Sequence, residues 1–427
     1  MRILYWIPRY DAGLMGNQIH VEVIEAWREM GVDAEVLTFS ASRKQRVTEA
    51  IDGIVVHRLP LNRTLLEKAL NRAAQPVMQY PYWVGALAHY RRFIAEQGRR
   101  FDLLHIETAF PLGALAALTP GPQPPQAVTL QGADVMAEPA FDYGYARFRA
   151  IRALLRRVFQ KAAVIRADSP MIERMVLGMG AQPARTVAIP FNITNADFPP
   201  ANVPPTTFRA QARQEICQRH GLDPDRPLLI SISRLHPFKG VEFLVEAIPA
   251  LQAAVGPVQV ILGGPSRTTP RFGDYGAYLK RRAQELGVAE ATHLIGRVEH
   301  SAIQRYWAAA DIVVVPSVVE SLNRVAAEAG AVGTPTIVTR TTGISEYVTA
   351  RDCGQIVEPR SGQSIAAAAT QLLTDRELWA RQSANGPWLA ADFRPAVIAR
   401  QLLDAYVKAL SPAPSPGPKG TPGRKGE

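Results

Sequence analysis

The sequence predicts an α/β protein made of two doubly wound domains, each built on a parallel sheet. The chain has 427 residues, more than one hydrophobic core usually organises. Short apolar runs alternate with amphipathic stretches, which is the pattern of β-α-β units. This rhythm stops at a proline-rich stretch, PPANVPPT, and then restarts, which predicts a second domain beyond it.

Each short apolar run bounded by turn residues is a predicted strand. In the first half these runs are Arg2–Ile7, Glu35–Thr38, Ile54–Leu59, Asp102–Ile106, Ala127–Leu130, Val164–Ala167 and Val187–Ile189. In the second half they are Leu228–Ser231, Val258–Leu262, His293–Ile295, Ile312–Val315, Thr336–Val338 and Gln355–Val357. The helices predicted in the first half are Gln18–Met30, Leu112–Leu118, Tyr145–Lys161 and Met171–Gly178.

The domain boundaries follow the same rhythm. Residues 1–198 form the first predicted domain, and residues 207–386 form the second. Residues 199–206 are the predicted linker, because prolines lack the N–H that a strand ladder needs. Residues 387–410 have the spacing of one long amphipathic helix. Residues 411–427 contain too few apolar side chains to bury and are predicted to be a disordered tail.

Composition narrows the class of protein. With 47% hydrophobic and 20% charged residues, the chain is typical of a globular protein. Two cysteines exclude a disulfide framework and suit a reducing cytoplasm. No stretch approaches the ~20 apolar residues of a spanning helix, and no cleavable signal pattern is present. The net charge of +10 is spread along the chain, which favours anionic ligands such as nucleotides over nucleic acid.

The densest functional signal follows the predicted strand Ile312–Val315, in PSVVESLNRVAAEAG. Glu320 lies in the loop, and Glu328 lies eight residues later, one turn into a helix that should begin near Asn323. Backbone N–H groups at such a helix start bind anions, while carboxylates suit sugar hydroxyls. The pattern therefore favours a ligand with phosphate in its middle and polyols at both ends. Either glutamate alone would be interpreted as a solvated helix-end charge.

A second signal follows the predicted strand Leu228–Ser231, in SRLHPFKG. Arg234 and Lys239 stand before the next helix, and two cations at a strand end can neutralise a departing diphosphate. Without the glutamate loop they would be interpreted as surface charges. No Asp-x-Asp follows a strand end and the histidines are scattered, so we expect no metal and no cofactor. Protein cations would then stabilise the diphosphate.

Together these motifs resemble family 4 of the retaining glycosyltransferases, which have the GT-B fold. The resemblance rests on the glutamates eight residues apart, the R-x4-K-G run, the G-G-P after the next strand and the G-T-P after the glutamate helix. It covers the chain from the first strand to about residue 410. It implies that residues 387–410 cross back onto the first domain.

The resemblance also implies roles for individual residues. Arg234 and Lys239 would hold the donor diphosphate, Glu320 would contact the transferred sugar, and Glu328 would bind the ribose. The other donor-side residues that it implies are the amides of Leu322, Asn323 and Arg324, the close-approach glycines Gly263 and Gly264, the base-side loop Arg297–Val298, and Gly16. Asn323 stands where the family often has glycine; asparagine tolerates left-handed backbone, so the loop can keep its shape.

The first half departs further from the family pattern. Met15 replaces the first glycine of the pair that ends at Gly16. Gln131 stands where many relatives carry a histidine close to the reacting carbon; it can position a hydroxyl but cannot take a proton. Asp134 is the nearest carboxylate, with helix capping as an equal alternative. His105 ends another strand, and we favour a buried, hydrogen-bonded role for it.

The expected reaction is transfer of a hexose-type sugar from a UDP- or GDP-linked donor, with retention and without metal. The acceptor would be a glycan, a lipid-linked sugar or a small molecule, in bacterial cell-surface polysaccharide or glycoconjugate synthesis. The alternatives are a nucleotide-sugar epimerase and a weakly active partner subunit, the latter favoured by Gln131 and Met15. We expect a cytoplasmic protein. The six basic residues of Tyr145–Lys161 are also typical of a helix on anionic lipid at the inner membrane face, although we favour packing against the core.

Overall fold

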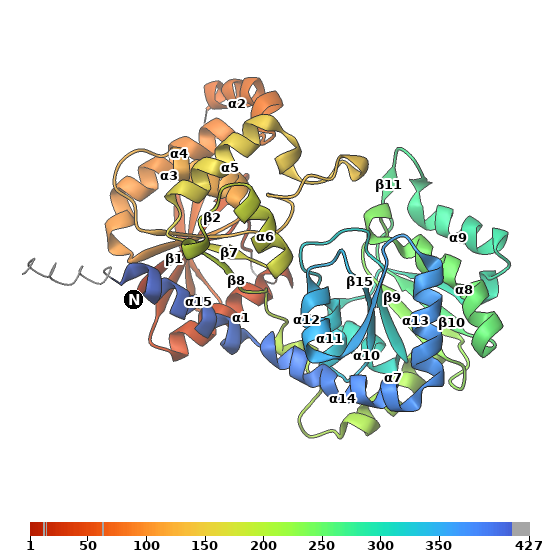
Figure 1. Cartoon of the computed structure of the whole chain (residues 1–427). Helices are drawn as coiled ribbons and strands as arrows, with labels where there is room; N and C mark the ends of the chain where they lie inside the picture. The colour runs from red at the N-terminus through yellow and green to blue at the C-terminus, as the bar shows by residue number, and fades with distance from the viewer. Residues whose placement is uncertain (12, 14, 62–63, 412–427) are drawn as a thin grey trace, which may run out of the picture.

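Two parallel sheets, one in each half of the chain, organise the protein (Figure 1). The computed structural model describes residues 1–11, 13, 15–61 and 64–411. The first sheet has eight strands in the order β3-β4-β2-β1-β5-β6-β7-β8. Its strands are β1 Arg2–Trp6, β2 Asp33–Ser40, β3 Val47–Ile51, β4 Ile54–Pro60, β5 Leu103–Glu107, β6 Gln126–Thr129, β7 Val164–Ala167 and β8 Thr186–Ala188. All its pairings are parallel except that of β3 with β4.

The second sheet has six parallel strands in the order β13-β10-β9-β14-β15-β16. They are β9 Leu228–Ile232, β10 Gln259–Gly263, β13 Thr292–Gly296, β14 Ile312–Val315, β15 Thr336–Thr339 and β16 Gly354–Val357. A small antiparallel hairpin, β11 Thr268–Thr269 with β12 Gly273–Asp274, stands apart from it. The two-domain α/β architecture predicted from the sequence is therefore present.

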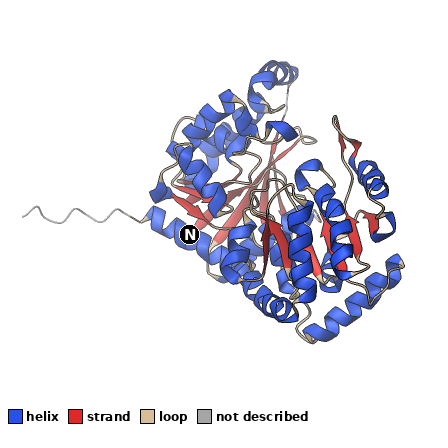
Figure 2. Cartoon of the chain, turned by 45° about the vertical axis from the view of Figure 1, so that its right-hand side comes forward, coloured by secondary structure: helices blue, strands red, loops and turns tan. Residues whose placement is uncertain are grey.

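Helices cover both faces of each sheet, as Figure 2 shows with the red strands between blue helices. In the first domain they are α1 Gln18–Glu29, α2 Leu65–Met78, α3 Trp83–Gln97, α4 Ala114–Leu118, α5 Arg149–Lys161 and α6 Pro170–Gly178. In the second they are α7 Pro205–His220, α8 Val241–Val255, α9 Tyr275–Glu285, α10 His300–Ala309, α11 Val325–Ala331, α12 Ile344–Arg351, α13 Gly362–Thr374 and α14 Arg376–Asp392. The last helix is α15, Pro395–Leu410.

Alternation along the buried strands builds a core on each face of a sheet. In β1, Leu4 and Trp6 pack in the cluster that includes α3 and α5, while Ile3 and Tyr5 pack in the cluster that includes α1 and α15. Successive side chains of a strand point to opposite faces, so a strand buried on both sides needs apolar residues at every position. This explains why the parallel strands were visible as unbroken apolar runs.

Every strand predicted from the sequence is present within one or two residues, but five other elements differ from the predictions. Strand β3 and helices α2 and α3 were not predicted. The helix predicted over Tyr145–Lys161 begins at Arg149, because a short 3-10 turn, Tyr145–Arg147, precedes it. The helix predicted over Leu112–Leu118 begins at Ala114, after a wide turn over Ala109–Gly113.

Helix α5 contains most of the basic stretch Tyr145–Lys161, for which packing against the core was favoured over contact with lipid. Ile151, Leu155, Val158 and Phe159 are buried in the first domain's core, so its apolar stripe is not available to a lipid surface. Among the described residues, no helix combines the length and the apolar content that crossing a membrane needs.

The predicted linker and the predicted last helix both need correction at a proline. Pro205 starts α7, so the last two residues of the stretch 199–206 already belong to a helix. The single helix predicted over 387–410 is two helices, α14 and α15. Arg394 precedes Pro395 and takes an extended conformation, which separates them. The tail predicted after Ser411 lies outside the described residues.

Helix α15 crosses from the second half of the chain to the first domain (Figure 1). Its residues Ile398 and Leu402 are fully buried beside α1. The Trp27 indole donates a hydrogen bond of 2.9 Å to the Ala399 carbonyl, and the Tyr406 hydroxyl lies 2.8 Å from His105 Nδ1. Meanwhile α14 packs on α11 of the second domain, with Gly330 and Gly386 in backbone contact.

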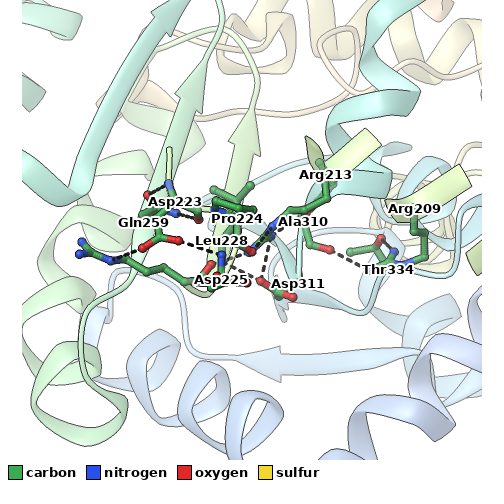
Figure 3. Close-up of polar contacts among 12 residues, drawn as sticks. Arg209, Arg213, Asp223, Pro224, Asp225, Leu228, Gln259, Ala310, Asp311 and Thr334 are labelled. Atoms are coloured by element: carbon green, nitrogen blue, oxygen red, sulfur yellow. Dashed lines mark hydrogen bonds and ion pairs between the residues drawn. The ribbon is translucent and has the colours of Figure 1, made fainter. Parts of the chain in front are cut away.

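Polar contacts join the segments that precede the strands of the second sheet (Figure 3). The Asp311 carboxylate accepts hydrogen bonds from Arg213 Nη1 at 3.1 Å and from the Leu228 amide at 2.7 Å. The Gln259 side chain accepts from the Asp223 amide at 2.8 Å and donates to its carbonyl at 2.8 Å. These polar groups satisfy one another, which marks a structural clamp.

Candidate active site

A cavity of about 490 Å³ lies between the two domains, where the carboxyl ends of their strands meet. The predicted residues that line it are Gly16, Gln131, Arg234, Lys239, Glu320, Leu322, Asn323, Arg324 and Glu328. The lining residues that were not predicted are Ile19, His20, Asp168, Phe191, Ile232, Ser233, Ser321 and Val325. The four charged residues that carried the sequence argument are therefore brought together in one place.

Lys239 reaches the cavity through a tight turn after β9. The turn Pro237–Lys239 ends at Gly240, whose φ is +64° and whose Cα faces the Pro316 carbonyl; a Cβ there would lie 2.0 Å from that oxygen. Only glycine fits, so the loop after β9 can press against the loop after β14. As a result Lys239, which is 9% exposed, forms an ion pair with Glu320. An ammonium has three N–H donors, so two remain for a ligand.

The loop that carries Glu320 is pinned by its neighbour after β15. The Glu320 amide donates to the Thr341 carbonyl at 3.2 Å, and the Gly343 amide donates to the Glu320 carbonyl at 3.1 Å. The Ile344 amide donates to the Leu322 carbonyl at 2.8 Å. The loop therefore keeps its shape without a ligand.

Asn323 adopts a left-handed backbone conformation, with φ of +68°, as expected for a position where the family often has glycine. Its side-chain oxygen accepts a hydrogen bond of 3.0 Å from the Val325 amide, which opens α11. Within the described part of the chain, the backbone N–H groups of Leu322, Asn323 and Arg324 have no hydrogen-bond acceptor. Such free amides beside a cavity are suited to the oxygens of an anion.

Glu328 is buried in the first turn of α11, the helix that follows this loop. It is 6% exposed, and the Trp307 indole donates to it at 3.3 Å. Burial raises the pKa of Glu328, while the charges of Arg324 and His300 act against that rise. Arg324 in turn donates to the Asn192 carbonyl of the first domain at 2.9 Å. Glu328 is therefore a buried acceptor that retains hydrogen-bonding capacity.

The first domain contributes Gln131, which follows β6. The Gln131 side chain donates a hydrogen bond of 2.9 Å to Glu107, a fully buried carboxylate at the end of β5. Although burial opposes it, the nearby His105, His20 and Arg166 hold the pKa of Glu107 below its usual value. The position where the resemblance implied a histidine is thus occupied by an amide anchored on a buried charge.

Two other predicted residues of the first domain, His105 and Asp134, are buried and do not line the cavity. His105 is 1% exposed and lies 2.7 Å from the Thr129 hydroxyl, so its role is the buried one favoured from the sequence. Burial lowers its pKa to about 3. Asp134 accepts from the amides of Ala109 at 2.6 Å and Gln131 at 3.0 Å, and burial raises its pKa to about 6. Asp134 therefore holds the loop and does not line the cavity.

The glycine pair and the base-side loop are placed differently from the prediction. A Cβ on Gly264 would lie 1.7 Å from the Ser233 carbonyl oxygen, so the close neighbour of this glycine is the chain itself. A Cβ on Gly263 would lie 2.8 Å from Ile232. Arg297 forms an ion pair of 3.3 Å with Glu299, and Val298 packs against the second domain's core. None of these predicted residues lines the cavity.

Sequence reasoning missed His20 and Asp168. His20 is in the first turns of α1, 2.8 Å from the Tyr5 hydroxyl, and burial lowers its pKa. Asp168 directly follows β7, a strand whose bounds were predicted without error. A carboxylate immediately after a buried parallel strand was the signal that could have found it. Across the described residues, no group of three or more metal-ligating side chains is close enough to hold a metal ion.

Direct contacts close the domains around the cavity. The Ser169 hydroxyl of the first domain donates to the Ser321 carbonyl of the second at 2.6 Å, and both residues are buried. At the surface, Arg174 forms two hydrogen bonds, of 2.9 and 2.8 Å, with the Glu346 carboxylate across the same junction.

A second cavity of about 530 Å³ adjoins the first, and Arg234 lines both. It lies between the hairpin β11–β12 and the first-domain loop at residues 139–143. Rings from both domains meet there, since Tyr143 stacks on Phe238 with their centroids 5.3 Å apart.

Two family models match the chain, one over each domain. Residues 17–192 match "Glycosyl transferase 4-like domain", and residues 212–387 match "Glycosyl transferases group 1". Among characterised proteins, the chain is 29% identical over 327 residues to a GDP-mannose-dependent alpha-(1-6)-phosphatidylinositol monomannoside mannosyltransferase of Mycobacterium tuberculosis. That match covers 74% of this chain and 77% of the relative.

Two solved structures share the fold. A sucrose-phosphate synthase from Thermosynechococcus elongatus superposes with a TM-score of 0.71 at 21% identity, covering 95% of this chain and 98% of the other. Anabaena Alr3699/HepE in complex with UDP superposes with a TM-score of 0.70 at 18% identity, covering 96% and 100%.

Proposed function

Because the chain belongs to family 4 of the GT-B glycosyltransferases, we propose that it transfers a hexose-type sugar from a UDP- or GDP-linked donor, with retention of configuration. Its acceptor would be a hydroxyl of a glycan, a lipid-linked sugar or a small molecule. The corresponding role is bacterial cell-surface polysaccharide or glycoconjugate synthesis.

The observation that carries the proposal is the convergence of Arg234, Lys239, Glu320 and Glu328 on one cavity. Two cations and a set of free amides suit the two phosphates of the donor. Glu328, buried at one end, suits the ribose diol, and Glu320, near the first domain, suits the sugar. In the proposed binding mode the ribose lies at Glu328, the diphosphate at Arg234 and Lys239, and the sugar at Glu320.

The proposed step breaks the bond between the anomeric carbon and the donor's phosphate oxygen. The acceptor oxygen forms a new bond to that carbon on the same face, and its proton passes to the departing phosphate oxygen. Gln131 need not take the proton on this route, which is consistent with an amide at that position. Arg234 and Lys239 stabilise the charge of the nucleoside diphosphate as it leaves. We therefore propose that the reaction needs no metal.

Two nucleotide bases, guanine and uracil, are candidates for the donor. The mycobacterial relative is GDP-mannose-dependent by name, and the Anabaena structure contains UDP. Both bases therefore belong in the test.

The test is a panel of UDP- and GDP-sugars with chelator present, followed by nucleotide binding in a calorimeter and release of nucleoside diphosphate. We expect one donor to bind and to be hydrolysed slowly without acceptor, and NMR of a transfer product to show the donor's anomeric configuration. The variant Glu320→Gln should lose turnover. Glu358→Gln is the matched control, because Glu358 also follows a strand of this sheet and pairs with an arginine, Arg340, outside the cavity.

If no nucleotide sugar binds or turns over, the proposal is wrong. An epimerised donor formed without acceptor would instead favour the epimerase alternative. An inverted product would contradict the retention step alone.

A further inference from the structure

Asp168 is a buried carboxylate with an unused oxygen at the cavity wall. It follows β7 and is 1% exposed, yet it lines the cavity between the domains. In the described chain its Oδ1 has no hydrogen-bond partner. Nearly all buried polar atoms in folded proteins are paired, so an unpaired carboxylate oxygen in a residue that lines a cavity indicates a missing ligand group.

Asp168 does not cap the helix that follows it. The neighbouring Ser169 caps helix α6, because its hydroxyl accepts from the Ile172 amide at 3.3 Å. Asp134 on the same sheet offers the contrast, since both of its oxygens accept backbone N–H bonds. Among the described residues, Asp168 has no equivalent pair of backbone donors, and the Ser321 side chain and Arg166 offset only part of the cost of burying it.

The chemistry of the missing group follows from the charges around Asp168. Asp134 and Glu320 are acidic neighbours that make a negative charge less favourable there, while Arg166 and the Ser321 side chain favour it. A phosphate group would add negative charge to this set and is therefore a poor partner. A hydroxyl can donate one hydrogen bond to the carboxylate and carries no charge.

Two molecules could supply this hydroxyl, the nucleotide sugar and the acceptor, and their positions in the cavity distinguish them. The nucleotide sugar is assigned to the second-domain wall, through Arg234, Lys239 and the glutamate loop. Asp168 belongs to the first-domain wall, where it follows the strand next to the one that precedes Gln131. The group that enters between these walls and faces the donor sugar is the acceptor.

We propose that Asp168 binds a hydroxyl group of a sugar or polyol acceptor and fixes the acceptor in the cavity next to Gln131. This inference rests on the proposed function. Asp168 would bind either a second hydroxyl of the acceptor or the hydroxyl that reacts. The acceptor must therefore present a hydroxyl group to this carboxylate. Asp168 is then an acceptor-binding residue of the first domain.

The test compares Asp168→Asn and Asp168→Ala with the full-length wild-type chain. We expect both variants to bind UDP or GDP within about twofold of wild type and to retain slow donor hydrolysis. Transfer to the acceptor found in the panel should fall by about tenfold or more in kcat/KM, because a hydrogen bond to a charged group is lost. The melting temperature of the Asn variant should be unchanged or higher. If Asp168 had a structural role, the melting temperature would fall.

Asp102→Asn is the matched control. Asp102 precedes β5 at the other end of the same sheet, where its carboxylate accepts from the Arg2 amide at 2.7 Å. Its transfer kinetics should equal those of wild type. Three results would overturn the inference while leaving the proposed function standing: unchanged transfer in Asp168→Asn, loss of nucleotide binding, or a lowered melting temperature in that variant. A wild-type chain that binds no nucleotide sugar would overturn the proposed function itself, and the inference with it.

Discussion

The Gln131 side-chain nitrogen lies 2.9 Å from the Glu107 carboxylate, and this contact fixes which end of the amide faces the cavity. A carboxylate whose pKa lies below its usual value is ionised near neutral pH and can only accept hydrogen bonds. The NH₂ group of Gln131 must therefore point to Glu107, which leaves the carbonyl oxygen for the cavity. Under the proposed function, Gln131 would accept a hydrogen bond from a substrate hydroxyl.

This contact predicts a pH-dependent defect in Gln131→Glu. The new carboxylate would stand beside Glu107, and replacing an attraction by a repulsion between buried charges costs about 1–3 kcal/mol. One of the two carboxylates would bind a proton on folding, so the variant should lose stability as pH rises. Thermal unfolding at pH 5.5 and pH 8 measures this. Gln131→Ala should show no such pH difference relative to wild type; an equal loss in both variants would contradict the explanation.

The ion pair between Lys239 and Glu320 predicts opposite defects in the two partners. Lys239→Ala should weaken UDP or GDP binding by about tenfold to a hundredfold, because a charge-assisted contact to phosphate is lost and Glu320 is left unpaired. Glu320→Gln should leave nucleotide binding nearly intact and lower turnover, because the amide still bonds to Lys239. Calorimetry and donor hydrolysis separate the two effects. Equal loss of nucleotide affinity in both variants would argue that Glu320 is only a support for Lys239.

Glu328 predicts selectivity for ribose over deoxyribose. If its carboxylate accepts hydrogen bonds from the ribose hydroxyls, wild type should bind UDP or GDP about tenfold or more tightly than the 2′-deoxy form, and Glu328→Ala should bind both alike. Because burial raises the pKa of Glu328, nucleotide affinity should weaken on acidification at a higher pH than an ordinary glutamate would require. Glu328→Gln should remove that pH dependence. Persistent discrimination in Glu328→Ala would place the ribose elsewhere.

The sequence was sufficient to predict the four charged residues because they follow buried strands. Apolar runs located β9 and β14, and the carboxyl ends of neighbouring parallel strands meet at one edge, so Lys239 and Glu320 had to lie close together. The same reasoning also named Arg297 and the glycine pair, which do not line the cavity, so their roles stay predictions. Which residues border a cavity depends on local packing, such as that of the Ser233 carbonyl against Gly264, and no residue pattern encodes it.

Other features depend on how the domains dock, which the sequence could not predict. Asp168 meets the Glu320 loop only because residues more than a hundred positions apart are brought together, as Ser169 and Ser321 are. Helix α2 was missed for a different reason. It contains Pro76 and buries only Asn71, while Leu65 and Leu66 are exposed, so no core-facing stripe marks it.

Asp168 also predicts how stability depends on pH. Burial raises its pKa to about 7, compared with about 3.9 for an unfolded aspartate. The folded chain therefore binds more protons than the unfolded chain between these values, so stability falls as pH rises from about 4 to about 7. Asp168→Asn has no such proton, and the difference in melting temperature between this variant and wild type should grow in favour of the variant from pH 5 to pH 8. A constant difference would mean that Asp168 stays ionised throughout.

The surface pair of Arg174 and Glu346 predicts that domain closure can be weakened without touching the cavity. The two residues bridge the domains through hydrogen bonds of 2.9 and 2.8 Å. Glu346→Arg places two cations at the junction, and exposed pairs of this kind contribute about 1 kcal/mol or less, so only partial opening is expected. Small-angle scattering in low salt should show a larger radius of gyration for this variant, and compaction when UDP or GDP is added. An activity assay should show reduced sugar transfer. The swap Arg174→Glu with Glu346→Arg should restore wild-type values, since it keeps the attraction. If the single variant scatters and turns over like wild type, the buried contact of Ser169 with Ser321 is sufficient to hold the domains closed.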